Sequence, residues 1–133
     1  MIDSKNKLTY SLIITGPPYG TQKALSAYHF ANALLHKKHI LKTIFFYQEG
    51  VLNGNKFIFM DSNELNLNEA WQQIAKKSGC KIQICGSASL RRGVISKEQS
   101  LLSNIYNLAD NFTITGLISF AEAILNSDRT IQF

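Results

Sequence analysis

The sequence predicts a three-layer α/β/α fold around a mostly parallel sheet of about five strands. Short apolar segments with β-branched and aromatic residues alternate along the chain with segments whose apolar residues recur at the helical period. This alternation is typical of a parallel sheet that carries helices on both faces. No repeat, low-complexity tract or linker interrupts it, so residues 1–133 are expected to form one domain, long enough to bury a substantial core.

The expected strands are short stretches of largely apolar residues. They are Tyr10–Thr15, Leu41–Tyr47, Lys81–Cys85, Phe112–Thr115 and Asp128–Phe133. Glycine and proline break the pattern directly after the first strand, in the segment Gly16-Pro17-Pro18-Tyr19-Gly20. Residues 49–55 are expected to form a loop or a short turn of helix, and residues 56–63 to be irregular.

Four helices are expected where apolar residues fall on one face. The first runs from about Thr21 to Lys37. The second ends at Gly79, because glycine readily closes a helix, and its apolar face is Leu67, Ala70, Trp71, Ile74 and Ala75. The third begins at Ser96 and Gln99, which form a capping-box pattern, and it carries Leu102, Ile105, Tyr106 and Ala109. The fourth carries Leu117, Ile118, Ala121, Ile124 and Leu125.

Composition excludes several classes of protein. No apolar run approaches the ~20 residues of a membrane span, and no apolar segment of a signal peptide follows the charged N-terminus, so we expect a cytoplasmic protein. Two cysteines are too few for a disulfide framework and are expected to be free thiols. The net charge of +5 is spread along the chain, so a nucleic-acid-binding patch is not expected.

Cys85 is the main candidate for chemistry. It ends a predicted strand and is followed by small residues, Gly86-Ser87-Ala88-Ser89, and then by Arg91 and Arg92. Sites in parallel α/β folds gather beyond the carboxyl ends of the strands, so we expect an accessible thiol at an edge shared with segments 16–21 and 48–55. Nearby arginines favour the reactive thiolate. The alternative is a buried structural thiol, a common environment for free cysteine.

Several sequence blocks, taken in order, resemble the DsrE/DsrF-like family of small sulfur-relay proteins. The blocks are Thr15–Gln22, Phe45–Val51, Ala70–Gln73, Ile84–Cys85, Leu90–Val94 and Asp128–Phe133. The resemblance extends from about Tyr10 to Phe133, and the blocks together are far more specific than any one of them. Cys80 lies outside the family pattern, and it is interpreted as structural or incidental.

The resemblance implies a sulfurtransferase that carries sulfur as a persulfide on Cys85, the one catalytic residue predicted. It implies a role in the relay that forms 2-thiouridine at the wobble position of certain tRNAs. It also implies a heterohexamer with two sister subunits of the same fold, TusB and TusC, with TusA as sulfur donor and TusE as sulfur acceptor. No metal or organic cofactor, membrane contact or direct tRNA contact is expected.

Two other functions remain open from the sequence. One is a structural subunit of the same complex without a catalytic role. The other is a flavodoxin-like module that binds a nucleotide or flavin at Gly16–Thr21, although this turn lacks the lysine of a P-loop and the spacing of a dinucleotide-binding loop.

The remaining candidates carry less weight. Ser87 and Ser89 are possible donors to the thiolate, and Tyr47 and Glu49 are expected near the rim. The apolar residues Phe57–Met60 are interpreted as an exposed interface. The histidines are not expected to form a metal site; they are His29, His36 and His39.

Overall fold

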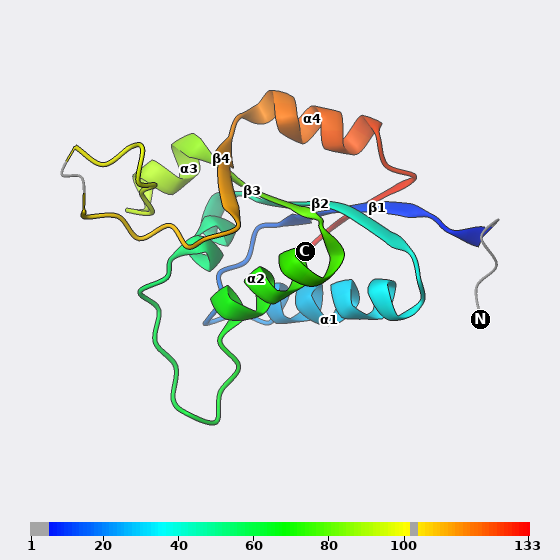
Figure 1. Ribbon diagram of the computed structural model, residues 1–133, viewed down its shortest axis with the longest axis horizontal. Coiled ribbons are helices and arrows are strands. Elements are labelled where there is room, and N and C mark those ends of the chain that lie inside the picture. Colours follow the sequence, from blue (N-terminus) through cyan, green and yellow to red (C-terminus); the bar gives the residue numbers. More distant parts are fainter. Residues whose placement is uncertain (1–5, 102–103) are drawn as a thin grey trace.

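The structure is a computed structural model that describes residues 6–101 and 104–133 (Figure 1). Its strands are β1 (Thr9–Ile14), β2 (Ile40–Phe46), β3 (Lys81–Cys85), β4 (Phe112–Thr115) and β5 (Arg129–Gln132). Its helices are α1 (Lys23–His36), the 3₁₀ helix η2 (Gln48–Gly54), α2 (Leu67–Ser78), α3 (Gly86–Arg91) and α4 (Leu117–Leu125). Within these two ranges, no helix is long and apolar enough to cross a membrane.

All five strands are parallel and lie in the order β4-β3-β2-β1-β5. Each predicted strand is confirmed to within one residue at either end. Because the strands are parallel, their carboxyl ends share one edge of the sheet, which we call the carboxyl edge. Figure 1 shows α1 and α2 on one face of the sheet and α4 on the other, so the predicted three layers are confirmed.

The face of the sheet toward α1 and α2 carries the apolar core. Alternate residues of the central strands point to this face, and each is at most 2% exposed: Leu12, Ile14, Ile44, Phe46, Ile82 and Ile84. Trp71 of α2 is fully buried and makes edge contacts with the ring of Phe46 at 5.3 Å and with that of Tyr28 in α1 at 5.7 Å. Trp71 is therefore a core residue.

The opposite face of the sheet is more polar and is covered less completely. The strand register places Ser11, Thr43, Gln83, Cys85 and Thr115 on it. Helix α4 covers part of this face through Phe120, whose ring centroid lies 4.9 Å from that of Phe45. The predicted apolar helix is present, but no residue of α4 is buried. Its large apolar residues Leu117, Ile118 and Leu125 are 60%, 78% and 83% exposed.

The prediction of a helix that begins at Ser96 is wrong, because the described residues of this segment form turns and an irregular path. The capping box itself is present: Ser96 N donates to Gln99 Oε1 at 3.0 Å, and Gln99 N donates to Ser96 Oγ at 3.2 Å. Farther along, the carbonyl of Asn107 accepts a hydrogen bond from Lys56 N at 2.8 Å. Such tertiary bonds replace those of a helix. Leu102 lies outside the described residues.

Asn53, fully buried in η2, joins three segments at the carboxyl edge. Its Nδ2 donates to the carbonyls of Gly50 at 2.8 Å and Gly16 at 3.0 Å. Its Oδ1 accepts from the Trp71 indole at 3.0 Å, and its carbonyl accepts from Asn68 Nδ2 at 2.7 Å. The turn after β1, η2 and α2 are thereby held together by fully satisfied buried hydrogen bonds, the condition under which such bonds stabilise a fold.

Two glycines have a specific backbone role. At Gly50, where η2 passes the end of β1, a Cβ atom would lie 2.0 Å from the carbonyl oxygen of Ile14, so a larger residue would force the backbone to move. Gly79 ends α2 in the left-handed conformation, with φ of 73°, as predicted.

Strand β5 is fastened to β1 at both ends. At its start, Asp128 Oδ2 accepts hydrogen bonds from Thr9 N at 2.8 Å and Thr9 Oγ1 at 2.9 Å. At its end, the carbonyl of Phe133 accepts from Thr15 N at 2.8 Å and from Thr15 Oγ1 at 2.9 Å. The main-chain and then the side-chain hydrogen bond from Thr9 hold the pKa of Asp128 below its usual value.

Replacement of Asn53 by alanine is expected to lower the free energy of unfolding by about 3 kcal/mol, because the carbonyls of Gly16 and Gly50 and the Trp71 indole lose a buried partner. Urea unfolding followed by circular dichroism measures the change. Asn63→Ala, at an exposed asparagine, is the matched control and should change stability by less than about 0.5 kcal/mol. Similar effects of both substitutions would contradict the role given to Asn53.

Asp128→Asn is expected to destabilise the protein near neutral pH and to lose this effect in acid. A carboxyl whose pKa is lowered by folding contributes stability above its unfolded pKa of about 4, and the contribution disappears as pH falls through the folded pKa. Urea midpoints for both proteins at about pH 7, 5 and 3 test the sign. A difference that does not shrink toward the lowest pH would contradict it.

Candidate functional site

Cys85 lies at the carboxyl edge, as predicted. It is the last residue of β3 and the residue that precedes the first turn of α3. In the sheet it pairs with Thr115, the last residue of β4. Its Sγ lies 3.6 Å from Ser87 Oγ, within hydrogen-bonding range for sulfur.

The thiol is buried, which corrects the prediction that it is open to solvent. Cys85 is 4% exposed, and the small residues that follow it form the short helix α3. These small residues let the backbone approach the sheet closely. A Cβ atom on Gly86 would lie 3.2 Å from Ile114 Cγ2, and both Ala88 and Ser89 are buried.

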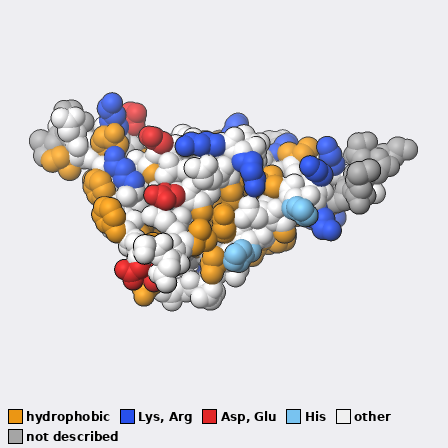
Figure 2. Space-filling view, turned by 60° about the horizontal axis from the view of Figure 1, so that its bottom comes forward, with side chains coloured by type: hydrophobic (Ala, Val, Ile, Leu, Met, Phe, Trp, Pro, Cys, Tyr) orange, Lys and Arg blue, Asp and Glu red, His pale blue; other side chains and the backbone are white. Residues whose placement is uncertain are grey.

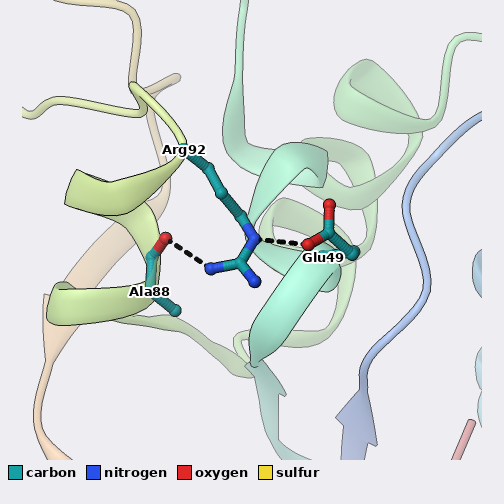
Figure 3. A network of polar contacts seen from close by, with 3 residues as sticks. All are labelled: Glu49, Ala88 and Arg92. Carbon is teal, nitrogen blue, oxygen red and sulfur yellow. Dashed lines mark hydrogen bonds and ion pairs between the residues drawn. The ribbon is translucent and has the colours of Figure 1, made fainter.

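Arg92 fastens α3 to η2 (Figure 3). Its Nε donates to Glu49 Oε1 at 2.7 Å, and its Nη1 donates to the carbonyl of Ala88 at 3.1 Å. The side chains of Arg92 and Glu49 are 27% and 55% exposed, so solvent weakens this ion pair. The guanidinium therefore binds a carboxylate and a main-chain carbonyl. Support of the Cys85 thiolate by Arg91 or Arg92 stays a prediction.

Two unpartnered polar atoms lie on the same face of the sheet as Cys85. Among the described residues, Gln83 Oε1 and Thr115 Oγ1 are buried side-chain atoms without a hydrogen-bond partner. Gln83 precedes Cys85 by two positions in β3, and Thr115 is the residue of β4 that pairs with Cys85. The sequence analysis missed both residues, because only the pairing of the strands shows which side chains flank the thiol.

Helix η2 brings together the three segments expected at the carboxyl edge. Asn53 donates to Gly16 in the turn after β1, and Glu49 pairs with Arg92 after α3. Glu49 and Arg92 were each singled out from the sequence, but their contact was not predicted. Sequence spacing alone gives no sign of this contact, since the two residues lie 43 positions apart.

Other candidate residues have structural surroundings. Cys80 is buried just before β3, and burial raises the pKa of its thiol above the usual value, which leaves it protonated and poorly nucleophilic. Ser89 Oγ donates to the carbonyl of Gly86 at 2.8 Å rather than to the Cys85 thiol. His39 Nδ1 accepts from Leu8 N at 3.1 Å. In residues 6–101 and 104–133, no cluster of three or more His, Cys, Asp or Glu could hold a metal ion.

Comparison with known proteins identifies the family. The DsrE/DsrF-like family matches residues 9–133. The Sulfurtransferase TusD homolog of Vibrio cholerae is 47% identical over 128 residues, which cover 95% of this chain and 98% of that protein. Sulfurtransferase TusD of Photorhabdus laumondii is 48% identical over 130 residues, which cover 96% and 99%.

A solved structure confirms the fold. The crystal structure of the ychN protein from E. coli superimposes with a TM-score of 0.74 at 19% sequence identity, covering 96% of this chain and 99% of that one. The relatives named above confirm the prediction that the chain is a sulfurtransferase. The chain belongs to the DsrE/DsrF-like family.

Proposed function

We propose that this chain carries sulfur as a persulfide on Cys85 in the relay that forms 2-thiouridine at the wobble position of tRNA. The observation that carries the proposal is the position of Cys85 at the carboxyl end of β3, between β4 and α3, in a chain 47% and 48% identical to two proteins named for TusD. Neither nucleotide nor flavin chemistry is needed for this role.

The proposed transfer is two successive exchanges at one sulfur. The Cys85 thiolate attacks the outer sulfur of a donor persulfide, the sulfur–sulfur bond of the donor breaks, and the donor leaves as a thiolate. An acceptor thiolate then attacks the outer sulfur now held on Cys85 and releases the Cys85 thiolate. Sulfur moves without net oxidation, and each departing thiolate takes up the proton that the attacking thiol gave up. The hydroxyl of Ser87, 3.6 Å from the Cys85 Sγ, is suited to donate a hydrogen bond to the sulfur.

Burial of Cys85 means that this chemistry requires the thiol to become exposed. Helix α3 is only six residues long, and the ion pair between Arg92 and Glu49 ties it to η2. Movement of α3 away from η2 is therefore the opening that we propose. An ion pair of this exposure contributes little stability, which keeps such an opening accessible.

We further propose that the chain works in the cytoplasm in a heterohexamer with the sister subunits TusB and TusC, takes sulfur from TusA and passes it to TusE. The apolar residues of α4 support assembly, since this helix has no buried residue and exposes Leu117, Ile118 and Leu125. Exposed apolar surface of this kind marks contact sites between proteins. Direct contact with tRNA is not part of the proposal.

Cys85→Ser is expected to abolish sulfur uptake. After incubation with a persulfide donor, intact-mass spectrometry should show an added ~32 Da on the unsubstituted chain and on Cys80→Ser, but not on Cys85→Ser. Full labelling of Cys85→Ser would show that another residue carries the sulfur. No labelling of any of the three proteins would favour a structural subunit.

Glu49→Gln is expected to speed alkylation of Cys85 by iodoacetamide about two- to fivefold, because loss of a partly exposed ion pair is worth roughly 0.5–1 kcal/mol. Peptide mass spectrometry gives the rate at each cysteine, and Cys80 serves as the internal reference. Glu69→Gln, at an exposed glutamate in α2, is the matched control. Equal acceleration at Cys80 and Cys85 would indicate general loosening and argue against movement of α3.

A further inference from the structure

A groove of about 510 Å³ opens at the carboxyl edge, and we call it the rim groove. One wall is the turn after β1, with Pro17, Pro18 and Tyr19. The other wall is the segment after η2, with Ile58 and Phe59. Figure 2 shows one face of the molecule, with apolar side chains exposed across it and acidic side chains in its left half.

The aromatic side chains of the rim groove are unusually open to solvent. Tyr19 is 75% exposed and Phe59 is 87% exposed. A large aromatic ring that is exposed to solvent lacks the favourable free energy that it would gain by burial in a contact. Tyrosine and phenylalanine are also among the residues enriched at protein interfaces. The walls of the rim groove therefore have the chemistry of a docking surface rather than of a core.

The charge of the rim groove selects among partners. Among the described residues, its charged lining consists of Asp61 and Glu64, although the whole chain has a net charge of +5. Carboxylates repel the phosphate backbone of a nucleic acid and attract lysine and arginine. An apolar groove with an acidic lip fits a protein segment that carries a large apolar side chain flanked by basic residues.

The location of the rim groove connects it to the thiol. Its walls follow β1 and β2, and Cys85 ends β3. Figure 1 shows the segment after η2 and helix α3 at the same end of the sheet. Strands β1 and β3 flank β2, so they lie about 10 Å apart, two strand spacings. The groove and Cys85 therefore share the carboxyl edge of the sheet, and a protein held in the groove lies at the same edge as the thiol.

We propose that the rim groove docks an extended, basic and apolar segment of the protein that exchanges sulfur with Cys85. This inference rests on the proposed persulfide function but concerns binding alone. Docking places the partner at the carboxyl edge before α3 opens. The partly exposed ion pair that holds α3 and the buried hydrogen bonds of Asn53 that hold η2 suit this division, because α3 can move while η2 stays in place.

The test uses Cys85→Ser protein, so that binding is measured without sulfur transfer. Two fluorescein-labelled peptides of about ten residues share a Leu-Phe centre and carry either lysines or glutamates beside it; fluorescence anisotropy gives their affinities. The lysine peptide should bind more tightly. Phe59→Ser should weaken its binding by about tenfold. Phe57→Ser, at an exposed ring outside the lining, is the matched control and should leave the affinity within about twofold.

Reversal of the acidic lip, D61K/E64K, should invert the preference so that the glutamate peptide binds more tightly. The proposal is overturned by equal binding of the two peptides, by equal effects of Phe57→Ser and Phe59→Ser, or by a labelled RNA strand whose binding depends on Phe59. Failure of the persulfide function would appear instead as absent sulfur labelling, with peptide binding intact.

Discussion

Asn53 is the residue on which the geometry of the carboxyl edge depends. Its side chain reaches the turn after β1, its own helix η2, and Trp71 in the core. Because η2 is fixed in this way, Glu49 in the same helix has a defined position, and it in turn holds Arg92 and the end of α3. Buried hydrogen bonds therefore hold η2 to the core, whereas a partly exposed ion pair joins α3 to η2.

The two faces of the sheet explain how one small chain can be both stable and interactive. The face toward α1 and α2 is apolar, and it carries buried side chains from both helices and from the central strands. The other face holds Ser11, Thr43, Gln83 and Cys85, with α4 as a partial cover whose own apolar side chains remain exposed. Stability therefore does not require the polar face to be sealed, which leaves it free for chemistry and assembly.

The sequence was sufficient for the strands, for α1 and α2, and for the place of Cys85, because the hydrophobic period and glycine stops decide these features locally. It failed where distant segments decide. The capping box at Ser96 forms a turn but no helix, since Asn107 bonds instead to Lys56. The ion pair of Arg92 with Glu49 likewise joins residues 43 positions apart. Sequence reasoning had no means of pairing these residues.

The attachment of Phe133 to Thr15 has a practical consequence for work on the purified protein. Because the carbonyl of Phe133 is bound at the carboxyl edge, an affinity tag fused after it would emerge beside the turn that follows β1. Such a tag would hinder partner proteins from binding at that edge and would complicate the interpretation of pull-down experiments. An affinity tag placed before β1 would emerge at the opposite end of the sheet, far from Cys85.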